Sequence, residues 1–123
     1  MNLENLKKLN LPVEKFAIFG SGPLVIRKIR ESDDIDIIVK PELWSELVNK
    51  YTSLKDNLIK VGDVEIYKDW LPWIGDINQL IDNADIIEGF RFVKLEYVLE
   101  WKKAMWREKD IKDIELIKKY MKN

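Results

Sequence analysis

The pattern of apolar and polar residues predicts short helices and strands from the start of the chain. Leucines recur at helical spacing over residues 3–9, which predicts a short amphipathic helix. The apolar run at residues 15–19 ends before a glycine, as expected of a buried strand. A turn at residues 20–23 follows and ends in a proline, a residue that favours the first position of a helix. We therefore expect a helix from Pro23 to about residue 29.

The middle of the chain predicts a strand, a helix and a hairpin. Isoleucine and valine alternate with other residues over 34–39, which indicates a second strand. A helix is expected after Pro41, because large apolar residues repeat with helical periodicity over residues 43–51. Residues 58–61 and 64–67 are two apolar segments joined by a Gly-Asp turn, a combination that favours a β-hairpin.

The last part of the chain is predicted to be mostly helical. In order, the expected elements are a loop at residues 69–76, a helix at 76–83, a short strand pair at 86–93, and two closing helices at 95–105 and 108–121. This mixture predicts a small mixed β-sheet flanked by helices, with helices at the C-terminus. The expected fold class is α+β, in a single domain that spans residues 1–123.

Composition narrows the chemistry that this fold can support. The 123 residues include no cysteine and no histidine, which excludes disulfides, thiolate zinc sites and Ser-His-Asp triads. The net charge of −1 gives the chain no overall attraction for nucleic acids or anionic membranes. No apolar run approaches the ~18 residues of a membrane span, and charged residues interrupt the N-terminal leucines. We expect no membrane segment, no signal peptide and a cytoplasmic location.

Asp34 and Asp36 are the first candidates for chemistry. Side chains alternate along a strand, so these two carboxylates are expected on one face, about 7 Å apart. Two like charges on a buried sheet are costly, and a divalent cation would offset that cost. A site made only of carboxylates prefers Mg²⁺ or Mn²⁺. The alternative is an acidic face of an exposed edge strand, although the surrounding isoleucines are very apolar for one.

Two further features lie close to these aspartates in the expected fold. Gly20 and Ser21 form a turn between a strand and a helix, where backbone N–H groups and a hydroxyl favour phosphate, although an ordinary turn has the same composition. Glu65 would complete a carboxylate triad if its strand lies beside that of the aspartates, and is otherwise a solvent-facing residue of the hairpin. Asp63 and Tyr67 share its face.

The C-terminal helices place charges on their inward faces. Lys102 interrupts an apolar stripe, and Asp110 and Asp113 share a helix face with isoleucines. These residues form either a basic wall near nucleotide phosphates or a structural cluster of ion pairs. Three cations close to the aspartates in sequence either meet phosphate or belong to a solvated helix face, namely Arg27, Lys28 and Arg30.

Two tryptophans have open roles. Trp70 and Trp73 flank a proline after the Glu65 strand, where they either stack on a base or pack in the core or a homodimer interface.

Together these motifs resemble the nucleotidyltransferase superfamily related to DNA polymerase beta. The matching segments are Phe19-Gly20-Ser21, the Asp-x-Asp strand at residues 32–39 and Val64-Glu65-Ile66. The resemblance covers about residues 15 to 68 and is greatest to minimal bacterial and archaeal forms, including the AbiE-type antitoxin group. The segment from Lys102 to Asp113 is similar to helices that close many of these domains.

The resemblance implies a nucleotidyltransferase-like fold and a Mg²⁺-dependent transfer of a nucleoside monophosphate from an NTP to an acceptor hydroxyl. Ser21 would contact the triphosphate, and Asp34 and Asp36 would hold the metal. Glu65, or Asp63 in its place, would be the third carboxylate. The acceptor stays open between protein, RNA and small molecules.

Two other functions fit parts of the pattern. The same fold without catalysis would act as a regulatory or antitoxin-like protein that binds a protein toxin. A metal-dependent nuclease of the restriction-endonuclease type would need a Glu-x-Lys pair on its second catalytic strand. Here Lys68 falls on the opposite face of the strand from Glu65, which argues against a nuclease.

Overall fold

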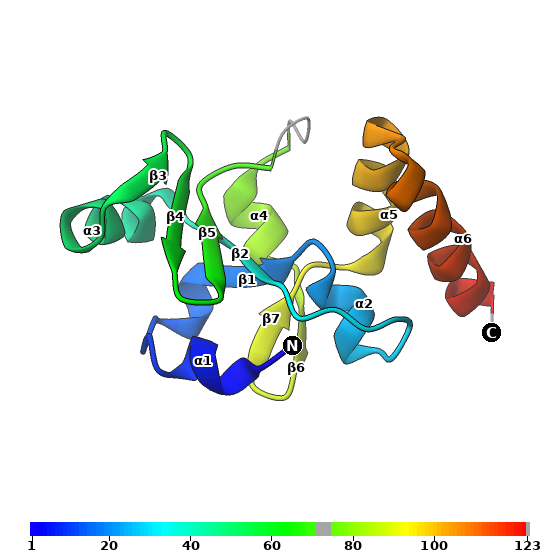
Figure 1. The fold of residues 1–123 in the computed structure, drawn as a ribbon, viewed down its shortest axis with the longest axis horizontal. Coiled ribbons are helices and arrows are strands. Elements are labelled where there is room, and N and C mark those ends of the chain that lie inside the picture. The colour runs from blue at the N-terminus through cyan, green and yellow to red at the C-terminus, as the bar shows by residue number, and fades with distance from the viewer. Residues whose placement is uncertain (71–74, 123) are drawn as a thin grey trace.

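The apolar segments of the sequence form the central strands of one mixed β-sheet in the computed structural model, which describes residues 1–70 and 75–122 (Figure 1). The strands of the sheet lie in the order β3-β4-β5-β2-β1-β7-β6. Their bounds are β1 (Phe16–Phe19), β2 (Ile35–Val39), β3 (Ser53–Lys55), β4 (Leu58–Val61), β5 (Val64–Tyr67), β6 (Asp85–Ile87) and β7 (Phe90–Phe92). The fold class is α+β, as predicted.

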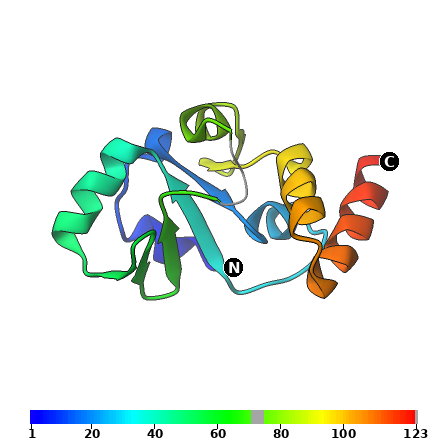
Figure 2. The same cartoon turned by 90° about the horizontal axis from the view of Figure 1, so that it is seen from above.

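Helices connect and cover these strands. Their bounds are α1 (Leu3–Lys7), α2 (Gly22–Ile26), α3 (Pro41–Lys50), α4 (Ile77–Asp82), α5 (Leu95–Met105) and α6 (Glu108–Lys122), with a short 3-10 helix at Val13–Lys15. Figures 1 and 2 show α5 and α6 side by side at one end of the molecule and α3 at the other. None of the helices within the described ranges has the length and apolar character needed to traverse a lipid bilayer.

Pairing within the sheet decides where the acidic residues lie. β1 runs antiparallel to β2, and β2 runs parallel to β5. The parallel register aligns Asp36 with Glu65, while the antiparallel register aligns Asp36 with Phe19, the last residue of β1. The Gly20–Ser21 turn therefore begins beside Asp36, and the strand of Glu65 lies on its other side.

The two faces of the sheet bury two separate hydrophobic clusters. Ile35 and Ile37 belong to the cluster that includes residues of α1 and α3. Ile38 belongs to the cluster that includes residues of α2, α4, α5 and α6. Because side chains alternate along a strand, Asp36 shares the face of Ile38. The acidic residue of β2 thus points toward the side of the sheet on which the C-terminal helices pack.

Most of the predicted elements are present, and the differences have local causes. β2 begins at Ile35, so Asp34 precedes the strand rather than opening it. α2 ends at Ile26, earlier than predicted, and Lys28 then adopts a left-handed φ of 61°. The three-residue strand β3 was not predicted, because its residues are all exposed and carry no alternating pattern. The predicted loop at 69–76 is described only in part.

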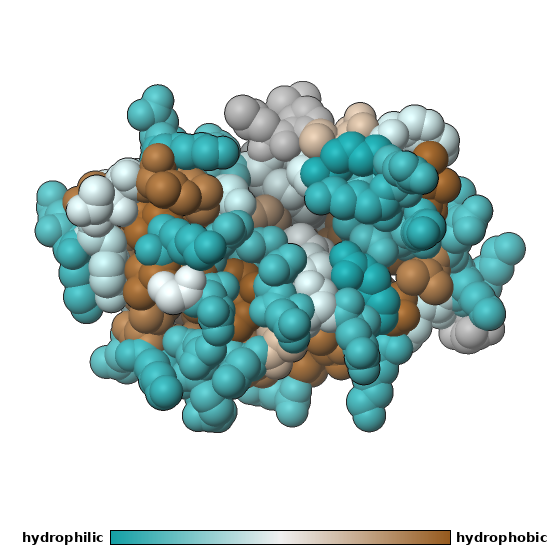
Figure 3. Space-filling view, in the orientation of Figure 1, coloured by the Kyte–Doolittle hydropathy of each residue, from teal (hydrophilic) through white to brown (hydrophobic). Residues whose placement is uncertain are grey.

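The surface in Figure 3 is mostly hydrophilic, with smaller hydrophobic areas between the charged side chains. The exposed large apolar residues are scattered over several elements. They include Leu54 on β3, Ile86 on β6 and Leu116 on α6. Scattered apolar side chains of this kind are normal for a folded protein and mark no single interface.

Candidate active site

Three carboxylates come together where β2 and β5 begin. Asp36 and Glu65 are direct neighbours across the two strands, and Asp34 immediately precedes β2. All three line one cavity of about 570 Å³. We refer to Asp34, Asp36 and Glu65 as the carboxylate cluster. The structure therefore brings together the acidic residues that the sequence singled out.

Asp63, the alternative third carboxylate, does not line this cavity. Its Oδ2 accepts a hydrogen bond from Asn5 Nδ2 at 2.8 Å. Asp63 lines a second cavity of about 540 Å³, which the whole carboxylate cluster also borders. The cluster is thus accessible from two cavities, and Glu65 rather than Asp63 faces both.

Burial, together with the crowding of negative charge, raises the pKa of Asp36 to about 7. Burial makes the largest contribution, followed by the charges of Glu65 and Asp34 and a hydrogen bond with Glu65, while the charge of Lys109 lowers it. Tyr67 donates a hydrogen bond of 2.8 Å from its hydroxyl to Glu65 Oε2. Burial, and then Glu65, raise the pKa of Tyr67 above its ordinary value. The folded protein therefore bears the cost of closely spaced acidic groups.

The donor set suits a hard divalent cation. The residues are carboxylates without histidine or cysteine, which is the chemistry that Mg²⁺ and Mn²⁺ prefer. Within the described part of the chain, no three such side chains are already arranged as metal ligands. Asp34, Asp36 and Glu65 would hold the ion.

Gly20 lets the turn after β1 approach the carboxylates closely. Its φ of 67° is in the left-handed region, and a Cβ at this position would lie 2.9 Å from Asp36 Oδ2. Ser21 is buried, and its hydroxyl donates a hydrogen bond to Ser32 Oγ at 3.2 Å. The same Ser32 Oγ accepts a hydrogen bond from the Asp34 amide, also at 3.2 Å. Both turn residues line the cavity. The turn is therefore tied to the segment that carries Asp34.

The opposite side of the cavity is basic. Four cationic side chains line it, and we refer to them as the basic wall: Arg30, Lys102, Arg107 and Lys109. Lys109 is close enough to the carboxylate cluster for its charge to lower the pKa of Asp36. The cavity thus lies between acidic and basic groups that influence one another across it.

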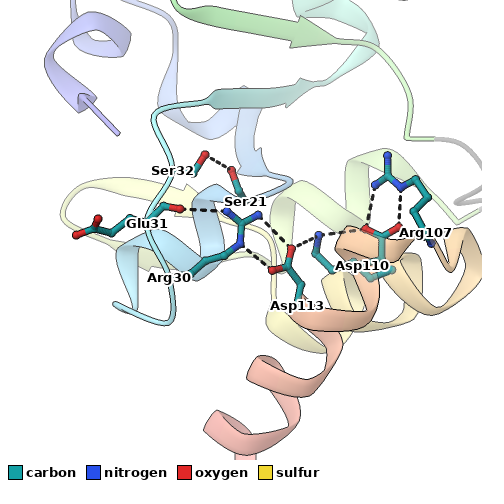
Figure 4. Close-up of polar contacts among 8 residues, drawn as sticks. Ser21, Arg30, Glu31, Ser32, Arg107, Asp110 and Asp113 are labelled. Carbon is teal, nitrogen blue, oxygen red and sulfur yellow. Dashed lines mark hydrogen bonds and ion pairs between the residues drawn. The ribbon is translucent and has the colours of Figure 1, made fainter.

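Ion pairs hold Arg30, Lys102 and Arg107 of the basic wall in place, and Figure 4 shows several of these contacts. Lys102 is only 4% exposed, and its Nζ lies 2.9 Å from Asp113 Oδ2 and 3.6 Å from Asp110 Oδ1. Arg107 donates to Asp110 from Nε at 2.6 Å and from Nη2 at 3.0 Å. Burial alone would raise the pKa of Asp110, but the hydrogen bonds and charge of Arg107 outweigh it, and the pKa is lowered. Lys102 is therefore both an ion-pair residue and a lining residue.

Aromatic and amide side chains complete the lining. Trp70 is buried and stacks on Trp101, with ring centroids 5.2 Å apart, which agrees with the expected core packing. Trp73, its predicted counterpart, lies outside the described residues. Sequence reasoning missed Asn57, whose amide donates to Asp69 Oδ1 at 3.0 Å on the cavity wall. The positions of Asn57 and Asp69 next to the hairpin strands were the one feature of the sequence that could have placed them near the site.

Comparisons with known proteins leave the family open. No protein-family model matches the chain, and neither the curated proteins nor the solved structures give a significant match.

Proposed function

We propose that the protein is a Mg²⁺-dependent nucleotidyltransferase that moves a nucleoside monophosphate from an NTP to an acceptor hydroxyl. The proposal rests on one observation, which is that the carboxylate cluster and the basic wall line the same cavity. A magnesium complex of a triphosphate has the matching pattern of charge. Its cations suit the carboxylates, and its phosphate oxygens suit arginine and lysine.

The Gly20–Ser21 turn supports the assignment of the phosphates. It lies beside Asp36, lines the cavity and has no side chain at Gly20 to keep a ligand away. In the proposed complex the β- and γ-phosphates contact this turn and the basic wall. The α-phosphate then lies next to the carboxylate cluster.

In the proposed reaction, the oxygen of the acceptor hydroxyl attacks the α-phosphorus of the NTP. The new O–P bond forms as the bond from the α-phosphorus to its bridging oxygen breaks, and pyrophosphate leaves. Glu65, oriented by the Tyr67 hydroxyl, accepts the proton of the attacking hydroxyl. Mg²⁺ would supply charge stabilisation for the attacking and leaving oxygens. Positioning and charge then provide most of the catalysis, which suits a chain without histidine or cysteine.

The test is transfer of label from each of the four NTPs, labelled on the α-phosphate, in the presence of Mg²⁺ and a cell extract. We expect a labelled acceptor with the wild type and a loss of labelling by orders of magnitude with Glu65→Gln. Asp63→Asn is the matched control and should retain transfer, because Asp63 lies outside the main cavity.

Two outcomes would change the proposal. Full transfer by Glu65→Gln together with none by Asp63→Asn would make Asp63 the third carboxylate. A wild type that binds Mn²⁺ and NTP but labels nothing, including proteins encoded beside it, would favour the non-catalytic, antitoxin-like function instead.

A further inference from the structure

Asp113 lies at the centre of the basic wall although it carries the opposite charge. Its carboxylate is buried, with Oδ1 2.8 Å from Arg30 Nε and Oδ2 3.1 Å from Arg30 Nη2. The same Oδ2 lies 2.9 Å from Lys102 Nζ. Arg30 belongs to the segment between α2 and β2, Lys102 to α5 and Asp113 to α6. One carboxylate therefore joins three parts of the fold, each of which places a cation on the cavity.

Attraction of phosphate does not by itself account for a buried aspartate at this place. A negative group beside a phosphate-binding wall weakens the attraction of that wall for phosphate. Geometry gives a different account. Arginine and lysine have long, flexible side chains, and a fixed carboxylate orients both before a ligand arrives. The forked contact with Arg30 sets the plane of its guanidinium as well as its position.

We propose that Asp113 is a positioning residue for the triphosphate, acting through Arg30 and Lys102. This inference rests on the proposed function. It adds that α6 helps to build the phosphate site through Asp113, although Asp113 itself does not contact the phosphates. The role is analogous to that of residues that hydrogen-bond to metal ligands and so orient them.

The substitution Asp113→Asn separates positioning from simple electrostatics, because the two predict opposite results. Removal of a negative charge alone would tighten the binding of an anion. Loss of positioning should weaken it, by about 10- to 100-fold if the role resembles that of residues that orient metal ligands. The probe is the magnesium complex of inorganic tripolyphosphate, titrated calorimetrically. Glu115→Gln is the matched control, because it removes the same charge from an exposed position on α6.

A second readout reports on the fold and on the carboxylate cluster. Mn²⁺ affinity, measured without phosphate, should change less than about twofold in Asp113→Asn, because the cluster does not contact Asp113. Arg30→Lys provides a second variant at a residue that is partly exposed and therefore tolerant. It keeps the charge but loses the forked contact, so weaker tripolyphosphate binding is expected here too.

The outcomes distinguish this inference from the proposed function. A wild type that binds neither Mn²⁺ nor tripolyphosphate would overturn both. If the wild type binds both ligands while Asp113→Asn or Arg30→Lys binds tripolyphosphate as tightly as the wild type does, only the positioning role is overturned. Weaker binding in both variants, with Mn²⁺ affinity kept and Glu115→Gln unchanged, supports it.

Discussion

Asp36 shows how a single residue can link stability to function. Its carboxyl is half-buried and lies beside two other carboxylates, so ionisation is unfavourable in the folded protein. The pKa rises from 3.8 to about 7. Between these two values the folded state keeps a proton that the unfolded state has released. The associated stability is present at low pH and is lost as the pH rises toward 7.

Asp36→Asn should therefore stabilise the metal-free protein above neutral pH. We expect a gain of about 1–2 kcal/mol at pH 8 after allowing for partial exposure, and little gain near pH 4. Thermal unfolding in EDTA across this pH range measures it. Asp56→Asn, at an exposed position, is the control and should give no pH-dependent difference. A gain for Asp36→Asn that is the same at every pH would contradict the role of ionisation.

Gly20 permits a second test at the scale of one residue. Gly20→Ala forces a side chain into a left-handed backbone and toward Asp36 Oδ2, so we expect a loss of about 1–3 kcal/mol in unfolding free energy together with weaker Mn²⁺ binding. Gly62→Ala is the matched control, because Gly62 has a φ of 59° but no atoms within 4 Å of the added Cβ. It should lose stability and keep its Mn²⁺ affinity, as urea unfolding and calorimetry would show. Equal loss of Mn²⁺ binding in both variants would rule out the close approach as the cause.

At the scale of elements, the predictions succeed where a pattern is local. The hairpin strands β4 and β5 begin and end where the two apolar segments and the Gly-Asp turn predict, which places Glu65. β3 lacks such a pattern and was missed. The ion pair between Arg30 and Asp113 joins residues 83 positions apart, so it depends on how α6 packs. The carboxylates could thus be named from sequence, with Lys102 and Arg30 as candidate phosphate contacts, whereas the ion pairs that hold these cations at the cavity could not.

Trp106, between α5 and α6, ends a helix in a conformation that a substitution should relieve. Trp106 caps α5 in a left-handed conformation, with φ of 50°, and is 62% exposed. Glycine adopts this conformation without steric cost, so Trp106→Gly should stabilise the protein by about 1 kcal/mol in urea unfolding. Trp106→Ala removes the same ring but keeps the strain, and it should give no such gain. A stabilisation of equal size in both variants would point to the ring rather than the backbone.

At the scale of the whole molecule, the cavity is lined from two parts of the fold. Strands β2 and β5, with Asp34 just before β2, supply the acidic side, while α5, α6, Arg30 and Arg107 supply the basic side. A ligand that carries both a metal and phosphates would contact both sides at once. The affinity for each component should then depend on the other.

This coupling predicts that Mg²⁺ and tripolyphosphate together raise the melting temperature by more than the sum of their separate effects. At 100 times the dissociation constant of the complex, the stabilisation should be about 2.7 kcal/mol. Asp34→Asn combined with Asp36→Asn should abolish the coupling. Differential scanning calorimetry provides the measurement, and additive shifts in the wild type would contradict a shared site.

The short strand β3 has a consequence for how the molecule meets copies of itself. It forms one edge of the sheet, with only three residues and an irregular register against β4, and β6 at the other edge is equally short. Lys55 and Asp85 place charges on these edges. Fibril growth needs a long, flat, uncharged edge on which an incoming strand can align. The folded sheet therefore offers a poor template for amyloid-like extension at either end.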